Sequence, residues 1–205
     1  MIGFYNYSVI LTYIGLTSAI IGMMEVSRGE FRLAMLCLIV AGICDMFDGN
    51  IARKMKNRTE QEKVFGIQID SLCDLVCFGV FPGAIAYSLS ANRILGITAA
   101  VLFTLAAVIR LAYFNVMEQE RQKETKEKRK YYQGLPVTSS SMIFPMLYVI
   151  RNLLGSTVYA YAFPIVMIIV AVLFVTDFKF KKPGKTASVI MALYGVAELL
   201  GVLLS

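Results

Sequence analysis

The chain of 205 residues contains no histidine and no tryptophan, and charged residues make up only 17% of it. Without histidine there is no imidazole to act as a general base, to complete a Ser-His-Asp triad, or to bind zinc or haem. Any chemistry must therefore use carboxylates, amines, guanidinium groups, phenols, thiols or bound metal. Soluble domains carry about 25% charged residues, so the low charge content argues against an ordinary soluble fold.

What the chain has in excess is apolar surface. Hydrophobic residues make up 58% of it, and its mean hydropathy is +0.67. This composition predicts an integral membrane protein with a single embedded domain over residues 1–205. It fits poorly with disorder, a disulfide scaffold or a nucleic-acid-binding domain. The 11 tyrosines and the basic residues are left to anchor the membrane interfaces, and the N-terminus shows no pattern of a cleaved signal peptide.

Cysteine is scarce, and its spacing does not indicate a metal or redox motif. The four cysteines lie in apolar stretches without any C-x-x-C pair, at Cys37, Cys44, Cys73 and Cys77. In such surroundings cysteine behaves as a small hydrophobic residue, and we favour that interpretation. The alternative is a metal or redox site, because Cys73 and Cys77 share a helix face at the i, i+4 spacing.

Hydropathy predicts an all-α fold with about seven transmembrane helices. Several apolar stretches approach the roughly 20 residues that span a bilayer. The fifth is short and polar at its start. The seven stretches cover residues 8–24, 31–52, 67–90, 94–117, 138–153, 157–176 and 186–204.

The distribution of basic residues indicates how the chain is oriented across the membrane. Most of the 20 lysines and arginines lie in three alternate loops, 53–66, 118–137 and 177–185. Cytoplasmic loops carry the excess of basic residues, so we expect a multi-pass protein of the cell membrane with an internal N-terminus and an external C-terminus. These loops could instead bind nucleic acid or a partner protein. Topology and attraction to anionic lipid headgroups explain them more simply.

Carboxylates occur where a membrane disfavours them. Intramembrane acidic residues cost about 2.5–3.5 kcal/mol each on insertion scales and are functional by default. Asp45 and Asp48 are spaced i, i+3, and Asp70 and Asp74 are spaced i, i+4, so each pair shares a helix face. The loop between the two helices is short, so we expect the four carboxylates to converge. Glu198 lies apart from them and could pair with Arg151 or reach an interface; we assign it no role.

Four carboxylates in one cavity repel each other unless cations neutralise them. Two divalent cations would balance their charge, and oxygen ligands without histidine favour Mg²⁺ or Mn²⁺. Such a pair of cations suits in-line phosphoryl chemistry. The alternative is a carboxylate-lined cation transporter or channel, which would place its charges near the membrane midplane in repeated halves. Here the charges gather at one membrane face, and the sequence has no internal repeat.

Small and basic residues accompany the aspartates. Gly49 and Ala52 follow Asp48 within one turn, and Gly66 precedes Asp70 by one turn. Small side chains let a ligand approach the backbone, although each one alone is more typical of helix packing, and only their combination with the aspartates favours a ligand site. Arg53 adds a cation that suits phosphate.

Together these residues resemble a family signature. The pattern reads Asp45-x2-Asp48-Gly49-x2-Ala52-Arg53-x12-Gly66-x3-Asp70-x3-Asp74. It is similar to that of the CDP-alcohol phosphotransferases, which move a phosphatidyl or phosphoalcohol group from a CDP-linked donor to an alcohol. All eight signature residues are present, and the segment between Arg53 and Gly66 is longer than is usual in the family.

The resemblance implies a role for each signature residue, within a signature segment that covers residues 45–74. Asp45, Asp48 and Asp70 would bind the metal ions, and Asp74 would contact metal and act as general base on the acceptor hydroxyl. The small and basic residues would line the CDP-diacylglycerol site: Gly49, Ala52, Arg53 and Gly66. Thr12, in the first helix, is a further candidate for contact with the nucleotide. The resemblance also implies a homodimer and a six-helix core, here followed by a C-terminal helix.

Two further segments are similar to the serine-using branch of the family, the phosphatidylserine synthases. Residues 110–115 read RLAYFN, where that branch has RLARFN, and residues 134–136 read GLP as in that branch. Tyr113 and the polar run 137–141 depart from the pattern. Arg110 and Asn115 are the candidate acceptor-binding residues. An arginine within a span must pair or face water, so Arg110 could bind a serine carboxylate, form a structural ion pair with an aspartate, or reach an interface.

The sequence thus predicts transfer of a phosphatidyl group from CDP-diacylglycerol to L-serine, giving phosphatidylserine and CMP in phospholipid biosynthesis. The alternative acceptors are inositol, glycerol 3-phosphate and an amino alcohol. A phosphorylated acceptor would need another basic cluster in the pocket. Arg110 lies deep within a span and Arg53 at the rim of the site, and this small number of cations favours an acceptor without phosphate.

Overall fold

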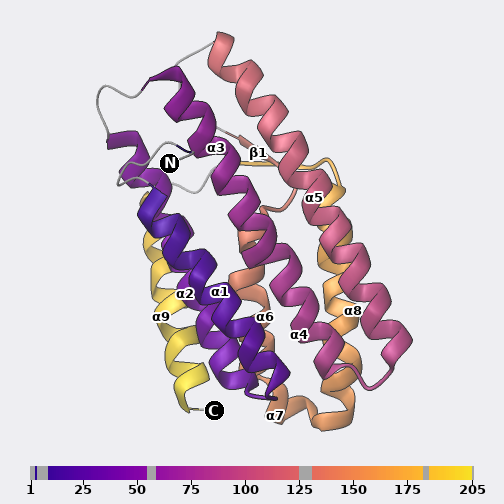
Figure 1. Cartoon of the computed structure of the whole chain (residues 1–205). Helices are drawn as coiled ribbons and strands as arrows, with labels where there is room; N and C mark the ends of the chain where they lie inside the picture. The colour runs from indigo at the N-terminus through magenta and orange to yellow at the C-terminus, as the bar shows by residue number, and fades with distance from the viewer. Residues whose placement is uncertain (1–2, 4–8, 55–58, 125–130, 182–184, 205) are drawn as a thin grey trace.

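The protein is a bundle of α-helices (Figure 1). The computed structural model describes the backbone of residues 3, 9–54, 59–124, 131–181 and 185–204, without the side chains of 50–54, 122–124, 131–133, 179–181 and 185–192. The α-helices are α1 (Ile10–Ser27), α2 (Phe31–Lys54), α3 (Glu60–Asp74), α4 (Phe81–Leu89), α5 (Arg93–Glu124), α6 (Ser140–Val149), α7 (Arg151–Leu154), α8 (Ser156–Val175) and α9 (Lys185–Leu204). A π-helical segment (Leu75–Val80) joins α3 to α4, and a 3-10 turn (Val137–Ser139) precedes α6.

Each of the seven apolar stretches contains an α-helix. Within the described residues, four helices are long and apolar enough to cross a membrane, over Ile10–Ser27, Glu60–Leu89, Arg93–Arg121 and Ser156–Val175. The predicted helical membrane fold is therefore confirmed. The number of seven crossings stays a prediction.

The outer surfaces of these helices are apolar, as lipid contact requires. On α8, Val158, Ile165, Ile169 and Val172 are each about half exposed, while Phe163 on the same helix is fully buried. A water-soluble bundle would place polar residues on the outer face of such a helix. The distribution on α8 therefore fits a helix that packs inward on the bundle and outward on lipid.

Aromatic rings fill the interior where α5, α6 and α8 meet. The ring centroid of Phe103 lies 5.5 Å from that of Phe144 and 5.0 Å from that of Phe174, and Phe144 stacks on Phe163 at 5.2 Å. All four side chains are almost completely buried. Interhelical packing of this kind holds membrane helices together, because the hydrophobic effect between them is weak in lipid.

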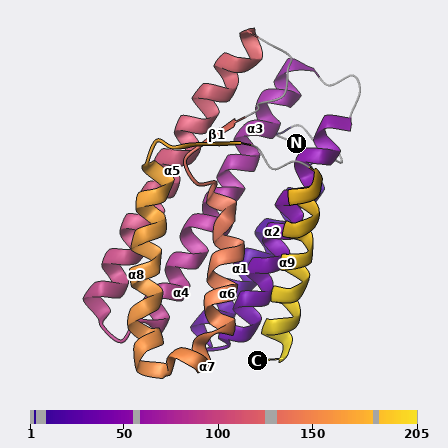
Figure 2. The same ribbon diagram turned by 180° about the vertical axis from the view of Figure 1, so that it is seen from behind.

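The helix ends that flank the basic loops gather at one end of the bundle. The end of α2, the start of α3 and the end of α5 lie there, together with two short strands (Figure 1). From the opposite side, α6 is seen between α8 and α9 (Figure 2). Helix α1 begins at this same end and α9 ends at the other, as the predicted topology requires (Figures 1 and 2).

The strands β1 (Tyr131–Gln133) and β2 (Lys179–Lys181) form an antiparallel pair that the sequence analysis does not predict. Two backbone hydrogen bonds from the residues after β1 extend this contact toward the helices. The Gly134 N–H donates to the Phe178 carbonyl at 2.8 Å, and the Leu135 N–H donates to the Leu173 carbonyl at 3.2 Å. The pair therefore ties the chain before α6 to the end of α8.

An irregular segment follows Asp74. Residues 75–80 are π-helical, and Pro82 at the start of α4 has no N–H to donate to the Phe78 carbonyl four residues earlier. The Ser140 hydroxyl of α6 donates to that carbonyl at 3.3 Å. The Thr104 hydroxyl of α5 donates to the adjacent Gly79 carbonyl at 3.4 Å. Two carbonyls of the irregular segment thus accept hydrogen bonds from two neighbouring helices, α6 and α5.

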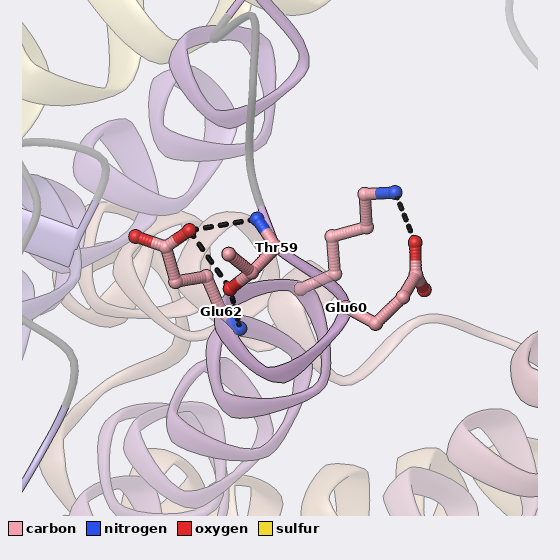
Figure 3. Close-up of polar contacts among 4 residues, drawn as sticks. Thr59, Glu60 and Glu62 are labelled. Atoms are coloured by element: carbon pink, nitrogen blue, oxygen red, sulfur yellow. Dashed lines mark hydrogen bonds and ion pairs between the residues drawn. The ribbon is translucent and has the colours of Figure 1, made fainter.

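The helix that carries Asp70 and Asp74 has a well-defined start (Figure 3). The Thr59 hydroxyl accepts from the Glu62 N–H at 3.2 Å, and the Glu62 carboxylate accepts from the Thr59 N–H at 2.8 Å. This capping box satisfies two backbone donors at the exposed helix end. It fixes where α3 begins and so contributes to the placement of the aspartates further along.

Candidate active site

Three of the four aspartates meet at one point. One carboxylate oxygen from each of Asp45, Asp70 and Asp74 lies within 4.8 Å of the others. Asp45 comes from α2, and the other two come from the same face of α3, as the spacing in the sequence predicts. Two helices that are adjacent in the chain therefore converge through their aspartates.

The fourth aspartate lines the same pocket and is held by the first helix. Asp48 is only 6% exposed, and its Oδ2 accepts a hydrogen bond from the Thr12 hydroxyl at 2.8 Å. The sequence singles out Thr12 as a nucleotide contact, and that role stays a prediction. What the structure adds is that Thr12 orients one of the four carboxylates.

The pocket lies between α1, α2, α3 and the π-helical segment. Apart from the aspartates, its lining is small or apolar. The lining residues are Thr12, Gly15, Ala41, Cys44, Asp45, Asp48, Cys73, Asp74, Cys77 and Phe78. A Cβ added at Gly15 would lie 3.3 Å from the Cys44 Cβ, so the glycine allows α1 to approach α2 closely here.

Three cysteines belong to this lining, and the sequence favours packing residues at these positions over a metal or redox site. Cys44, Cys73 and Cys77 are buried and free of disulfides. Their place in the pocket has a signal in the sequence, because Cys44 directly precedes Asp45 and Cys77 follows Asp74 by one helical turn. The described group with metal-binding distances contains aspartates and no thiol. The cysteines therefore shape the pocket wall.

The aspartate cluster is suited to hard divalent cations. One oxygen of Asp45 lies within 4.8 Å of one oxygen of Asp74. Carboxylates gathered this closely repel each other unless a proton or a cation offsets their charge. The donors at the cluster are carboxylate oxygens, which Mg²⁺ and Mn²⁺ prefer. The residues present therefore fit a site for divalent cations.

The small signature residues flank this cluster. Gly49 follows Asp48 in α2, Gly66 lies one turn before Asp70 in α3, and both are half-buried. Ala52 and Arg53 belong to the last turn of α2, and their side chains lie outside the described residues. The nucleotide-binding roles of these four residues stay predictions.

Helix α5 reaches the aspartate-bearing helix through a polar contact. The Ser71 hydroxyl, next to Asp70, donates to the Asn115 Oδ1 at 2.8 Å. Asn115 is a predicted acceptor-binding residue, and this contact puts it beside α3. The sequence analysis missed Ser71, whose only signal was its position inside the signature segment.

Arg110 is buried, with 6% of its surface exposed, and it binds backbone oxygens. Its Nε donates to the Leu135 carbonyl at 3.2 Å, and its Nη2 donates to the Gly134 carbonyl at 3.4 Å. Its guanidinium carbon also lies 5.9 Å from the centre of the Phe114 ring. The RLAYFN and GLP segments, which are separate motifs in the sequence, therefore meet through this side chain.

The serine hydroxyls of the polar run 137–141 find hydrogen-bond acceptors within the protein. The hydroxyls of Ser139, Ser140 and Ser141 donate to backbone carbonyls three residues earlier, at 2.6, 2.8 and 2.7 Å. Ser140 and Ser141 are also buried. The departure from an apolar pattern at this point is thus explained by local hydrogen bonds.

Glu198, the remaining intramembrane carboxylate, lies in α9 and is 3% exposed. Within the described residues its Oε1 has no hydrogen-bond partner and the pairing with Arg151 is not formed. The Arg151 guanidinium instead stacks 3.8 Å from the centre of the Tyr148 ring, and its Nη1 donates to the Tyr148 carbonyl.

Comparison with known proteins agrees with the signature. A family model described as CDP-alcohol phosphatidyltransferase matches residues 5–176. The chain belongs to this family. With its apolar helices, it is a multi-pass membrane protein of the CDP-alcohol phosphatidyltransferase family. The matched range includes α1 to α8 with all four aspartates, and it leaves out α9.

Several relatives carry the name CDP-diacylglycerol–serine O-phosphatidyltransferase. The one from Saccharomyces cerevisiae is 37% identical over 117 residues, which is 56% of this chain and 41% of the relative. The one from Helicobacter pylori is 31% identical over 142 residues, or 66% and 55% of the two chains. The one from Methanocaldococcus jannaschii is 26% identical over 192 residues, or 93% and 83%. The chain thus spans about half the length of the first two relatives.

Proposed function

We propose that this chain transfers the phosphatidyl group of CDP-diacylglycerol to L-serine, giving phosphatidylserine and CMP. The observation that carries the proposal is the meeting of Asp45, Asp70 and Asp74 from two helices, with Asp45 and Asp74 lining a pocket. Family membership supports the reaction class. The names of the relatives support serine as the acceptor.

Four aspartates would hold the divalent cations: Asp45, Asp48, Asp70 and Asp74. When bound, two such ions supply positive charge that stabilises both the attacking and the leaving oxygen of an in-line displacement. The Thr12 hydroxyl keeps the Asp48 carboxylate in one orientation. A preset orientation of the ligands matters, because a cation site loosened by even a small displacement loses affinity and rate.

Asp74 serves as the general base. Its carboxylate takes the proton of the serine hydroxyl, and the serine oxygen forms a bond to the phosphorus of the phosphatidyl group. The bond from that phosphorus to the bridging oxygen of CMP breaks, and this oxygen keeps the electron pair. To act in this way, Asp74 must come within about 2.6–3.2 Å of the hydroxyl, directly or through one water.

The rest of the pocket is assigned to the two substrates. Gly49, Ala52, Arg53 and Gly66 line the CDP-diacylglycerol site in this proposal, and Asn115 contacts the acceptor. The bond from Ser71 supports the latter role, since it holds Asn115 beside the helix that carries the base. The lipid chains enter sideways from the bilayer, and serine arrives from the aqueous side.

The proposal includes a cell-membrane location with the site facing the cytoplasm, seven membrane crossings and a homodimer. Asp45 and Asp48 lie in the second half of α2, and Asp70 and Asp74 lie in the last turns of α3. The helix ends that flank the basic loops gather at one end of the bundle (Figure 1). An excess of basic residues marks the cytoplasmic side. The homodimer rests on resemblance to the family alone.

The test is CMP release by the purified chain with CDP-diacylglycerol, Mn²⁺ or Mg²⁺, and one acceptor at a time: L-serine, inositol, glycerol 3-phosphate or ethanolamine. We expect CMP with serine, matched by an equal amount of phosphatidylserine. Release with another acceptor but not serine would replace the acceptor and keep the reaction class. No release with any acceptor, together with cation flux in vesicles, would favour a transporter instead.

A further inference from the structure

The first turn of α6 touches α2 and the π-helical segment that follows Asp74. On one side, a Cβ added at Gly42 of α2 would lie only 2.3 Å from the Ser141 Oγ and 2.6 Å from its Cβ. On the other side, the Ser140 hydroxyl donates to the Phe78 carbonyl at 3.3 Å. Gly42 lies one turn before Asp45, and Phe78 lies one turn after Asp74. The first turn of α6 therefore acts as a spacer between α2 and the π-helical segment, about one turn from an aspartate on each side.

The contact on the Phe78 side is specific rather than general packing. Because Pro82 has no N–H, the Phe78 carbonyl lacks the donor that a regular helix would supply, and Ser140 provides one. An unsatisfied carbonyl in this buried place would be costly. The spacer is thus attached to the irregular segment that follows directly after Asp74.

Arg110 holds the chain that leads into the spacer. Its Nε and Nη2 donate to the carbonyls of two successive residues, Leu135 and Gly134. A planar guanidinium presents donors in a fixed fork, which suits two oxygens with a fixed separation, whereas a lysine ammonium offers a single point of contact. The donors that bind this segment come from a helix, α5, that itself packs on the π-helical segment.

Gly134 is held from the opposite side. Its φ of +65° is a conformation that disfavours other residues, and an added Cβ would lie 3.0 Å from the Thr176 carbonyl oxygen and 3.2 Å from that of Phe174. Its N–H donates to the Phe178 carbonyl at 2.8 Å. The segment between β1 and α6 is therefore fixed between Arg110 and the end of α8.

We infer that Arg110 is a positioning residue for the aspartate cluster rather than a ligand of the acceptor. Together with Gly134 it fixes the spacer, and the spacer sets the separation of the α2 and α3 aspartates and hence the affinity for divalent cations. The expected effect on kcat rests on the proposed function, whereas the expected effect on the affinity for divalent cations is independent of it.

The experiment compares Arg110→Gln and Arg110→Lys with the natural chain by Mn²⁺ titration calorimetry and by CMP release at varied serine. Loss of support around metal ligands costs about 10- to 100-fold in affinity, so we expect a weakening of that size for Mn²⁺ in Arg110→Gln. The kcat should fall with it, while the KM for serine stays within about twofold of the natural value. Arg110→Lys should retain an intermediate Mn²⁺ affinity.

Arg151→Gln is the matched control, because Arg151 also donates to a backbone carbonyl, that of Tyr148, away from the pocket. It should leave Mn²⁺ affinity and kcat unchanged. A raised KM for serine with normal Mn²⁺ affinity in Arg110→Gln would overturn the inference and make Arg110 an acceptor ligand. Lower yield or thermal stability with normal affinity and kinetics per folded chain would also overturn it.

A second pair of variants tests the spacer without changing Arg110. Gly42→Ala should weaken Mn²⁺ binding, because the new methyl group collides with Ser141. The double variant Gly42→Ala with Ser141→Gly removes the collision and should restore most of the affinity. Weak binding in the double variant, or normal binding in Gly42→Ala, would contradict the spacer, and this holds even if Arg110 variants fail to fold. A natural chain that binds Mn²⁺ but releases no CMP would refute the proposed function and leave this test standing.

Discussion

Two groups of carboxylates lie in the apolar helices of this membrane protein, and they differ in their neighbours. Asp45, Asp70 and Asp74 come from two helices and lie within ligand distance of one another. Glu198 lies in α9, at 3% exposure, and one of its oxygens has no partner within the described residues. Both groups would be costly in lipid, and a buried carboxylate by itself would suggest function at either place. The comparison shows that convergence of several carboxylates carries the assignment, and that burial alone does not.

Glu198 lies where α9 packs on α6. Pro145 interrupts the hydrogen-bond ladder of α6. The Tyr194 hydroxyl, one turn before Glu198, donates to the Met142 carbonyl of α6 at 3.4 Å. This contact docks one helix on the other. The family match covers residues 5–176 and so does not include Glu198.

The largest expected effect comes from chelation, which acts on the aspartate cluster and not on Glu198. Removal of divalent cations with EDTA should reduce CMP release below detection, because the aspartates then repel each other and the diphosphate has no counter-charge. Addition of Mn²⁺ or Mg²⁺ should restore the activity. The thermal midpoint should also rise with cation concentration, since a ligand that binds only the folded state stabilises it. Full activity in EDTA would contradict the account.

Replacement of the base is the next largest effect. Asp74→Asn should lower kcat by about 10²- to 10⁴-fold, the usual contribution of general base catalysis. The asparagine has nearly the same volume, so CDP-diacylglycerol binding should persist. Both are measured on the same preparation, by CMP release and by equilibrium binding of the lipid nucleotide. Activity within a few-fold of the natural chain would remove Asp74 from the role of base.

Loss of the hydrogen bond to Asp48 should have an intermediate effect. Thr12→Val keeps the shape of the side chain and removes the donor that binds Asp48 at 2.8 Å. Hydrogen bonds to charged groups contribute about 1.5–3 kcal/mol, so we expect about a tenfold or greater weakening of Mn²⁺ binding. Thr12→Ser is the control, because it keeps the hydroxyl and should bind Mn²⁺ almost normally.

Glu198→Gln should have the smallest effect. The substitution leaves the aspartate cluster untouched, so kcat and Mn²⁺ affinity should stay within about twofold of the natural values. Its thermal midpoint should stay equal or rise, because a neutral amide is less costly to bury than a charged carboxylate. A loss of activity comparable to that of Asp74→Asn would break the comparison and make α9 part of the reaction.

The sequence predicted the parts of the site that depend on periodicity. Apolar stretches gave the helices, and the spacing of Asp45 with Asp48 and of Asp70 with Asp74 placed each pair on one face. A short connection between the two helices made their convergence expected. These features are local, so helical geometry translates them directly into position.

Contacts between distant segments could not be predicted in the same way. The bond from Arg110 to Gly134 and Leu135 depends on where α5 and the start of α6 meet in space. The sequence gives only the need of a buried arginine for partners, and backbone carbonyls meet that need as well as a substrate does. The π-helical segment and the strand pair were missed for a related reason, because neither produces a hydropathy pattern that differs from a regular helix or a loop.

The central claim is that the aspartates of α2 and α3 form one cation site. It is tested most directly by Mn²⁺ binding to the natural chain, to Asp45→Asn, to Asp70→Asn and to the double variant. If the two carboxylates share a site, each single substitution should weaken binding by about tenfold or more, and the double variant should lose less than the product of the two effects. Independent, multiplicative losses or unchanged binding in either single variant would contradict the claim.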